Sequence, residues 1–559
     1  MQQLITKTAI SDDQEPSGGL SANLVWLILL LIMVFSAVIR YGLLEVPFER
    51  DEGEYAYAGQ LMLQGIPPYQ ELYNMKLPGI YAVYAGIMAI FGQTHIAVHL
   101  GLLLINSATI VILFLLGRRL VNPLTGLIAA ACFATLSLSP SVQGVFANAE
   151  HFVILPALGG LLLLLKNLDD DRSPVILMAS GFLLGTGFII KQHGAAFIAL
   201  GGTYYLMDQI WSVNRDWKRI LKGGLWFLSG AVLPYGLTCI ILAAAGVFDR
   251  FWFWTVQYAS AYATLTTFDQ ALVELKASAL PILKTSPLIW FFTAIGIIAL
   301  FRDTRIRKRR LFILLFSLFS VVAVCPGFYF RPHYFILLLP AASLLAGIGI
   351  SSSLAGLVSR TQYQRSQFGL ALFIAFIIMA VSLFQQRQFL FQMSPTEATK
   401  SIYWPNPFAE SIAISEFVRN RTDPGDKIAI IGSEPQIFFY AKRHSATGYI
   451  YMYPLMERHD FALSMQKELI QEVEKARPKI MLFVNIQYSW WERAPDSPPL
   501  LFQWFQDYSK KYYQRIGLVE IFSDTTRYSL GSEEIKPPAT PFWVDIMERK
   551  PANNQGLPL

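Results

Sequence analysis

Long apolar runs, separated by short polar segments, occupy most of the chain between residues 22 and 386. A membrane-spanning helix needs about 20 mostly apolar residues, within a range of about 17–25. These runs predict a mainly α fold, a polytopic membrane bundle of about eleven spans. The predicted spans are 22–41, 95–117, 123–140, 148–165, 174–190, 193–210, 223–246, 285–301, 311–326, 332–355 and 366–386.

A further apolar run, 77–92, is short, and its length alone does not decide whether it crosses the membrane. Cytoplasmic loops of membrane proteins carry an excess of Lys and Arg. If 77–92 does not cross, the five inner loops hold sixteen Lys and Arg residues, more than the longer outer loops hold. Charge therefore favours eleven spans, a cytoplasmic N-terminus and an outer C-terminus. The 77–92 run then lies against or partly within the outer leaflet, covered by neighbouring spans.

From about residue 388 the pattern becomes that of a soluble domain. Amphipathic stretches predict helices at 412–422, 461–477 and 501–513, and short apolar runs predict strands within 423–432 and 478–485. Alternating helices and strands predict a small C-terminal soluble α/β domain with a mainly parallel sheet. The expected domains are a cytoplasmic tail at 1–21, a membrane domain at 22–387 with juxtamembrane helices in its outer loop 42–94, and an extracytoplasmic domain at 388–559.

The composition agrees with a membrane protein that carries a soluble part. Of the 559 residues, 54% are hydrophobic and 15% are charged, against roughly 25% charged in average soluble domains. The net charge of +6 is explained by the Lys and Arg residues of the cytoplasmic loops, so it does not predict a nucleic-acid partner. We therefore expect a multi-pass protein of a cell membrane, the inner or plasma membrane. The cysteines lie in apolar runs without metal-ligand spacing, and we interpret them as small core residues: Cys132, Cys239 and Cys325.

Acidic and basic residues from distant parts of the chain fall on the predicted outer side, each at the end of a span. Ionisable groups next to hydrocarbon are costly and commonly mark functional sites. A polar site at the outer edge of the bilayer explains them together. The candidates are Asp51, Glu52, Lys76, Glu150, Lys191, His193, Arg331 and His333.

Structural roles are the alternative for each of these residues. Asp51 is also suited to be a helix N-cap with Glu54 at the N3 position, and Glu49 is expected to be solvated. The cations also suit ordinary anchoring near lipid phosphates, and Glu150 suits a helix N-terminus. The two histidines also suit interfacial positions. The capping interpretation leaves Glu52 without a role.

The order of these features resembles the GT-C superfamily of membrane glycosyltransferases, in the branch with protein O-mannosyltransferases and the lipid A aminoarabinose transferase. The similarity rests on "RDEGEYAYAG" after the first span, then "GIPPY" and "MKLPG", which hold Asp51, Glu52 and Lys76. At the second acid this chain has Glu150, where some relatives have Asp. The span ending at Lys191, the stretch "FRPHYFILLLPAASLLAG" and the segment "DKIAIIGSEPQIFFYAKRHSATGY" are also similar to the family's pattern.

The resemblance implies transfer of a sugar from a polyprenyl-phosphate donor to a lipid, glycan or protein acceptor, at a hydroxyl or amine on the extracytoplasmic side. Asp51 is the expected general base, and Glu52 and Glu150 are expected to orient acceptor or sugar hydroxyls. Cations stabilise the charge that develops on the leaving phosphate. Lys76, Lys191, His193, Arg331 and His333 are the expected phosphate or substrate ligands. Since side-chain cations suffice for a monophosphate, no metal or other cofactor is expected.

Two other classes of function remain open at this stage. The first is a transporter or flippase for a lipid-linked sugar or a polar solute. Transporter sites usually lie near the bilayer midplane on broken helices, whereas no ionisable residue lies clearly at mid-depth in a predicted span. The second is a non-catalytic receptor that uses the outer domain, which leaves the polar cluster at 50–76 unexplained.

Overall fold

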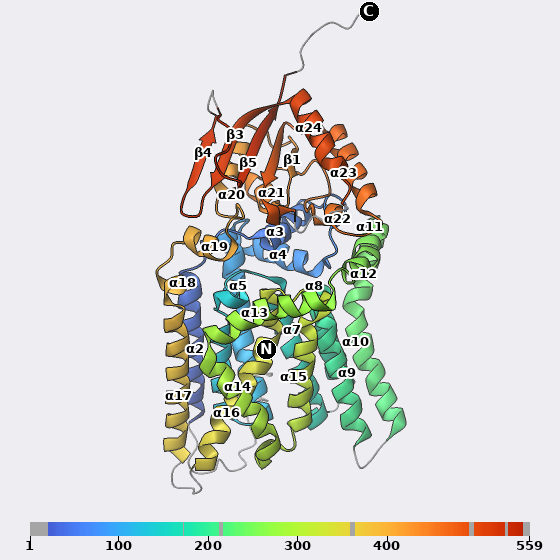
Figure 1. Ribbon diagram of the computed structural model, residues 1–559. Helices are drawn as coiled ribbons and strands as arrows, with labels where there is room; N and C mark the ends of the chain where they lie inside the picture. Colours follow the sequence, from blue (N-terminus) through green and yellow to red (C-terminus); the bar gives the residue numbers. More distant parts are fainter. Residues whose placement is uncertain are drawn as a thin grey trace, which may run out of the picture.

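A bundle of long helices carries a small sheet domain at one end (Figure 1). The structure is a computed structural model that describes residues 21–171, 173–211, 216–357, 364–490, 497–531 and 535–551. The predicted cytoplasmic tail therefore lies almost wholly outside the described residues. The sheet and its helices lie at one end of the bundle, which we call the domain-bearing end.

Helices stand at all eleven predicted spans. They are α2 (Ala22–Tyr41), α5 (His95–Leu120), α6 (Pro123–Leu136), α7 (Ala149–Lys166), α8 (Pro174–Ile190), α9 (Ala195–Ile210), α10 (Trp217–Ala244), α14 (Pro287–Arg302), α15 (Arg310–Val324), α16 (Leu339–Leu357) and α17 (Gln364–Gln385). By length and composition, six of the described helices suffice to cross a membrane. A bent pair of helices raises this number to seven. That the shorter helices also cross stays a prediction.

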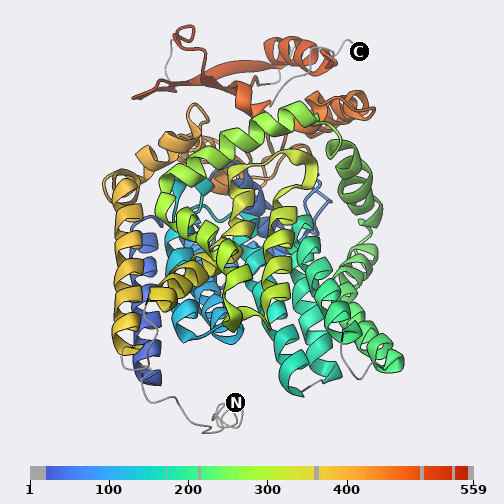
Figure 2. The ribbon, with the colours of Figure 1, turned by 60° about the horizontal axis from the view of Figure 1, so that its bottom comes forward.

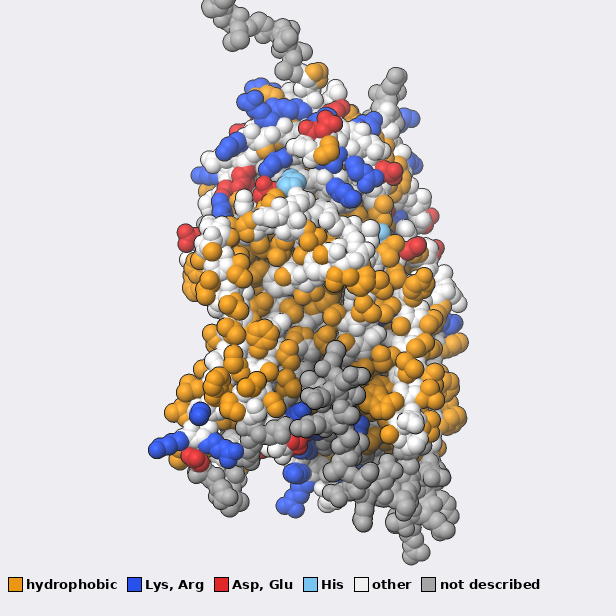
Figure 3. Space-filling model, turned by 180° about the vertical axis from the view of Figure 1, so that it is seen from behind, with side chains coloured by type: hydrophobic (Ala, Val, Ile, Leu, Met, Phe, Trp, Pro, Cys, Tyr) orange, Lys and Arg blue, Asp and Glu red, His pale blue; other side chains and the backbone are white. Residues whose placement is uncertain are grey.

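The surface of the bundle fits a bilayer. Apolar side chains cover its middle, and charged side chains gather at its two ends (Figure 3). The helices α10 and α17 show most of their apolar side chains at the surface. The core of a bilayer holds no water, so a spanning segment must satisfy its backbone hydrogen bonds internally. Helices with apolar surfaces do so and are the expected spanning elements. The protein is a multi-pass membrane protein.

Several helices lie at the domain-bearing end instead of running along the bundle (Figures 1 and 2). α13 (Phe268–Thr285) meets α14 at an angle of 101°. The aromatic-rich segment before α13 forms α11 (Phe248–Trp252), the π-helix η4 (Phe253–Tyr258) and α12 (Ala259–Tyr262). The loop 42–94 forms α3 (Arg50–Leu63) and α4 (Gly79–Phe91), both between the bundle and the sheet domain. The 77–92 run is therefore a short helix at this end.

The C-terminal part holds one sheet of five strands in the order β1-β2-β5-β3-β4. Only β1 and β2 are parallel, and the other neighbouring pairs are antiparallel. The expected α/β domain is confirmed, but the expectation of a mainly parallel sheet is wrong. The strands are β1 (Ile428–Ile431), β2 (Ile480–Asn485), β3 (Tyr513–Ile521), β4 (Thr526–Leu530) and β5 (Trp543–Arg549).

The reason for the mixed sheet is that three strands follow the last helix with no helix between them. β3 and β4 form a hairpin, and β5 then inserts between β2 and β3. Connections this short join antiparallel strands, whereas parallel pairs need a crossover. The helices of this part are α18 (Arg387–Phe391), α19 (Pro395–Tyr403), α20 (Ser411–Arg419), α21 (Pro435–Ala441), α22 (Tyr453–Met456), α23 (Ala462–Ala476) and α24 (Leu500–Tyr512).

The sheet domain packs tightly against α3. The Arg50 guanidinium donates to the Ser433 carbonyl and pairs with Glu434 at 2.9 Å. Gly53 packs so closely that a Cβ there would lie 2.5 Å from the Cβ of Gln436 in α21. A buried ion pair and a backbone contact this close leave no freedom for the two parts to slide. The first outer loop and the C-terminal domain therefore act as one packed unit.

We expect Gly53→Val to lower the midpoint of thermal unfolding of the detergent-purified protein, because the new side chain must push α3 away from α21. Overpacking of this kind costs about 1–3 kcal/mol. The matched control is Gly86→Ala in α4, where a Cβ meets nothing within 4 Å. That substitution should leave the midpoint unchanged or raise it slightly. Equal midpoints for Gly53→Val and the unmodified protein would show that α3 is not held against the domain.

Candidate functional site

The N-terminus of α3 is fixed by a capping box that uses different acids from those expected. Glu49 is the N-cap, and its carboxylate accepts from the backbone N–H groups of Asp51 and Glu52 at 3.0 Å each. Glu52 at position N3 reaches back to the N–H of Glu49 at 3.1 Å. The capping role proposed for Asp51 and Glu54 is therefore wrong, and so is a solvated Glu49, which is buried. The helix begins two residues earlier than that interpretation required.

Glu52 is fully buried and points away from the cavity described below. Its Oε1 accepts from the Ala147 N–H at 2.5 Å and lies 2.8 Å from Nε2 of His99. His99 in turn contacts the Leu44 carbonyl through Nδ1 at 2.9 Å. Glu52 thus joins α3, α5 and the loop before α7. Both of its oxygens accept hydrogen bonds within the protein, and Glu52 does not line the cavity. That it orients a substrate hydroxyl stays a prediction.

Because Glu49 and Glu52 form the capping box, Asp51 takes no part in it and faces the other way. The Lys76 ammonium lies 2.7 Å from Asp51 Oδ1 and 2.9 Å from Glu54 Oε2. The phenol of Tyr451 donates to the same Oδ1 at 2.8 Å, and Tyr81 donates to Glu54 at 2.5 Å. Asp51, Lys76 and Glu54 form an ion triad at the centre of the site.

Neighbouring charges outweigh burial at Asp51 and Lys76, whereas burial outweighs them at Glu54. Burial alone raises the pKa of Asp51, but Lys76, His333 and Lys191 outweigh it and hold the pKa below its ordinary value. Burial raises the pKa of Glu54, whose attraction to Lys76 offsets only part of this effect. The same two carboxylates raise the pKa of Lys76 against its own burial. Asp51 is therefore an ionised carboxylate and Lys76 an ammonium at neutral pH.

A second acid–base pair lies beside the triad. Lys191, at the C-terminal end of α8, forms an ion pair with Glu150 in the first turn of α7. The Lys191 ammonium also lies 4.4 Å from the centre of the Tyr334 ring. Nε2 of His333 is 4.0 Å from Glu150, and its Nδ1 contacts Gln143 Oε1 at 2.9 Å. Lys191 and His333 line the cavity, whereas Glu150 is fully buried behind them.

The remaining predicted cation and histidine also reach the cavity. Arg331 precedes η7 (Pro332–Leu338), and its guanidinium stands 5.6 Å from the centre of the Tyr329 ring. His193 lies in η3 (Gln192–Gly194) and contacts the Ala323 carbonyl through Nδ1 at 2.7 Å. Since a carbonyl only accepts, Nδ1 of His193 carries its proton.

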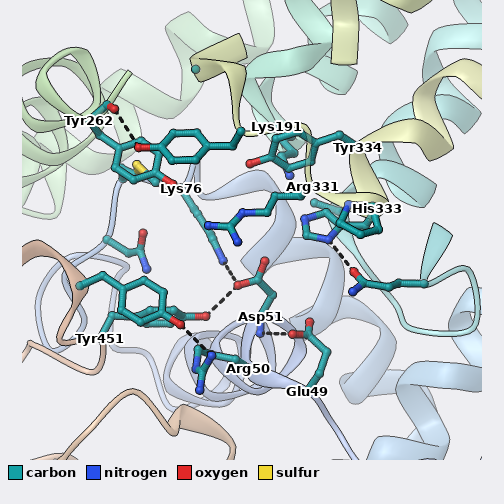
Figure 4. A pocket seen from close by; sticks show the side chains of 18 of the residues that line it. Glu49, Arg50, Asp51, Lys76, Lys191, Tyr262, Arg331, His333, Tyr334 and Tyr451 are labelled. Atoms are coloured by element: carbon teal, nitrogen blue, oxygen red, sulfur yellow. Dashed lines mark hydrogen bonds and ion pairs between the residues drawn. The ribbon is translucent and has the colours of Figure 1, made fainter. Parts of the chain in front are cut away.

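These residues surround one cavity of about 820 Å³ at the domain-bearing end. Figure 4 shows the side chains of Asp51, Lys76, Arg331, His333 and Tyr451 turned toward a common space. Of the eight predicted residues, six line the cavity, and Glu52 and Glu150 lie behind its wall. The six are Asp51, Lys76, Lys191, His193, Arg331 and His333. Their convergence confirms that they share one site, while their chemical roles stay predictions.

The C-terminal domain supplies part of the wall, which sequence reasoning did not predict. Tyr451, Tyr453 and Glu457 come from the segment around α22, and further residues come from 402–408. The lining is rich in tyrosines: Tyr55, Tyr258, Tyr262, Tyr329, Tyr334, Tyr403, Tyr451, Tyr453 and Tyr488. The tyrosines themselves are the sequence signal for this wall, and it is a weak signal because tyrosines are common at membrane edges.

No group of three or more His, Cys, Asp or Glu side chains is arranged to hold a metal ion within the described ranges. Asp51, Glu54 and Glu150 are each bonded to a lysine, and Glu49 accepts from backbone N–H groups. That the reaction proceeds without a metal stays a prediction.

Comparisons with known proteins agree with this architecture. Residues 76–235 match a family model described as dolichyl-phosphate-mannose-protein mannosyltransferase. ArnT from Cupriavidus metallidurans bound to undecaprenyl phosphate is similar in structure, with 14% identity, a TM-score of 0.54, and coverage of 94% of this chain and 98% of that chain. The archaeal oligosaccharyltransferase AglB from Archaeoglobus fulgidus, in complex with an inhibitory peptide and a dolichol-phosphate, matches with 14% identity, a TM-score of 0.51, and coverage of 91% and 75%.

At such identities the similarity shows a shared fold, and it confirms the resemblance stated from the sequence at that level. The family match begins at Lys76 and includes Glu150, Lys191 and His193, whereas Asp51 precedes it. Comparison with curated proteins gave no match.

We expect Lys76→Met to lower the thermal unfolding midpoint strongly, because it leaves the buried Glu54 and the half-buried Asp51 without their cation. Breaking a buried pair in this way costs about 3–5 kcal/mol. Without Lys76, burial and mutual repulsion raise both carboxyl pKa values above those of the unfolded chain, about 3.9 and 4.3. A raised carboxyl pKa costs stability at high pH, and the cost falls as the groups become protonated. The deficit should therefore be smaller at pH 5.5 than at pH 8.

The control for this measurement is Lys467→Met, at an exposed position in α23. It should change the midpoint little at either pH. A Lys76→Met deficit that is absent, or equal at both pH values, would contradict the ion triad.

Proposed function

We propose that the protein is an integral membrane glycosyltransferase that moves a sugar from a polyprenyl-phosphate donor to an acceptor hydroxyl or amine. The observation that carries this proposal is the single cavity in which Asp51 lies among Lys76, Lys191 and Arg331. The family match and the shared fold support the same class of enzyme. The neighbours were solved with undecaprenyl phosphate or a dolichol-phosphate, which supports a lipid-linked donor.

On the donor side, the site stabilises the leaving phosphate electrostatically. The bond between the anomeric carbon and the phosphate oxygen breaks, and the polyprenyl phosphate leaves with the electron pair. Preorganised cations in a site that excludes water stabilise this developing charge far more than they do in water. We assign this role to Lys76, Lys191, Arg331 and His333, with His193 lining the same wall.

On the acceptor side, we assign Asp51 as the general base. The acceptor oxygen or nitrogen attacks the anomeric carbon, and its proton passes to the Asp51 carboxylate. A positioned base contributes about 10²–10⁴-fold. Lys76 holds the pKa of Asp51 low in the unliganded protein. A donor phosphate that draws on the charge of Lys76 raises the pKa of Asp51 and makes the base stronger when the substrate is bound.

We assign Glu52 and Glu150 as positioning residues. Glu52 fixes the start of α3 through Glu49 and His99 and thereby sets the direction of Asp51. Glu150 fixes Lys191 and lies close to His333. Neither acid needs to touch the substrate in this arrangement.

We place the site on the extracytoplasmic side of the cell membrane, with the N-terminus in the cytoplasm and the C-terminal domain, residues 388–559, outside. The support is the Lys/Arg-rich character of the opposite loops. At that opposite end, Arg119 and Arg309 pair with Asp169 at 3.1 and 2.6 Å. The acceptor then reaches the cavity from the aqueous side and the donor from the lipid.

The transporter alternative requires a polar site near mid-depth of the bundle. The charged groups of the cavity instead stand at the ends of helices, beneath the C-terminal domain. This position favours chemistry at the membrane surface over passage through the bundle.

We expect purified protein, given a panel of polyprenyl-phosphate sugars and an extract of cell-envelope lipids and glycans, to release free polyprenyl phosphate from one donor. Mass spectrometry measures both the released carrier and the acceptor that gains the mass of the sugar. Heat-denatured protein is the control. Exchange of labelled sugar lipid across proteoliposomes without any carrier release would support the transporter and contradict the enzyme.

A further inference from the structure

The cavity has a second polar feature that the transfer chemistry above does not use. Glu457, directly after α22, lies in the cavity wall and is only 7% exposed. Tyr258 donates to Glu457 Oε2 at 2.5 Å. Within the described part of the chain, this is the one hydrogen bond of the Glu457 side chain. A buried carboxylate of this kind costs stability, and its presence in a cavity calls for a ligand.

The surroundings of Glu457 are aromatic. Tyr258 is buried against Trp254, and its ring lies 5.2 Å from that of His459. Tyr262 and Tyr329 stack with their centres 4.5 Å apart and an angle of 15° between their planes. All three tyrosines line the same cavity. Flat apolar faces with a few fixed polar groups are the usual construction of a small-molecule pocket.

The charge of Glu457 is only partly balanced. Burial raises its pKa to about 7, against the hydrogen bond from Tyr258 and the attraction of Arg331. By contrast, Asp51 and Glu54 share one lysine, and Glu150 has another. Glu457 differs from these three carboxyl groups because its direct partner in the described part of the chain is a tyrosine without a lysine. Perturbed carboxyl groups in clefts are candidates for function.

Position in the chain links Glu457 to the proposed base. Tyr451, which donates to Asp51, and Glu457 stand on the same short segment of the C-terminal domain, at either side of α22. A ligand that contacts Glu457 therefore contacts the segment that also holds Asp51. This domain lies beyond the end of the bundle, away from the lipid-covered surface (Figures 1 and 3).

We propose that Glu457, Tyr258, Tyr262 and Tyr329 form an acceptor subsite that binds a polyhydroxylated ring, a carbohydrate, of the molecule that receives the sugar. Glu457 accepts hydrogen bonds from neighbouring hydroxyl groups of this ring through the oxygen that Tyr258 leaves free. Tyr258 holds Glu457 in place, and the stack of Tyr262 and Tyr329 covers the apolar side of the ring. The C-terminal domain thereby selects the acceptor. This inference rests on the proposed glycosyltransferase function, because only that function has an acceptor.

The test compares Glu457→Ala and Glu457→Gln with the unmodified protein in the transfer assay. Loss of a hydrogen bond to a charged group should raise the acceptor KM about tenfold to a hundredfold in Glu457→Ala. Glu457→Gln keeps the shape of the side chain and should raise the acceptor KM less. The donor KM should stay within about twofold in both variants, since the donor phosphate is held elsewhere. The Gln variant keeps the test valid if the Ala variant does not fold.

The matched control is Glu468→Gln. Glu468 also accepts from a tyrosine, Tyr449, at 2.6 Å in the same domain, but it does not line the cavity. The acceptor KM of the Glu468→Gln variant should equal that of the unmodified protein. An unchanged acceptor KM in both Glu457 variants, or an equal rise in the donor KM, would overturn the subsite.

A direct binding measurement separates this inference from the proposed function. Methyl glycosides of common hexoses, titrated at millimolar concentration, should change the intrinsic fluorescence of the unmodified protein, because Trp254 packs on Tyr258. Glu457→Ala should lose this change, whether or not carrier release is ever detected. Equal responses in the two proteins, or no response to any glycoside, would exclude the subsite. Absence of carrier release with glycoside binding intact would instead reject only the transferase.

Discussion

The ion triad of Asp51, Lys76 and Glu54 is the interaction on which the rest of the site depends. Charges removed from water are tolerated only when partners and hydrogen bonds surround them. Here the partners come from four places: α3, the loop that carries Lys76, Tyr81 of α4, and Tyr451 of the C-terminal domain. Satisfying the triad therefore brings the first outer loop and the end of the chain together. The cavity is the space that this assembly leaves open.

The same principle explains why the cations of the cavity are held ready for an anion. Lys76 and Lys191 are each fixed by an acid that does not itself need to face the ligand, Glu54 and Glu150 respectively. Their positions are thus set before the donor arrives, which reduces the reorganisation that binding would otherwise require.

Much of this could be predicted from the sequence, because hydrophobic runs and the side of each charge follow from membrane physics. The helical bundle, the C-terminal domain and the convergence of Asp51, Lys76 and Arg331 were accessible in this way. The capping box was misplaced because Glu49 and Glu52 have the same spacing as Asp51 and Glu54. Contacts such as Tyr451 with Asp51 join residues 400 positions apart, and no local pattern marks them. The antiparallel strands after α24 were missed because charged residues, such as Glu520 in β3 and Asp545 in β5, interrupt their apolar runs although both strands are largely buried.

The turnover number of Asp51→Asn tests the central claim most directly. Asparagine keeps the size and an oxygen that can face Lys76 and Tyr451, Glu54 still pairs with Lys76, and Glu49 remains the N-cap. The variant should therefore fold, although the loss of one charge of the triad should lower its midpoint of thermal unfolding. Our account predicts that its turnover falls at least about 10²-fold while binding of polyprenyl phosphate persists. An unchanged turnover number in the folded variant would contradict the assignment of Asp51 as the base.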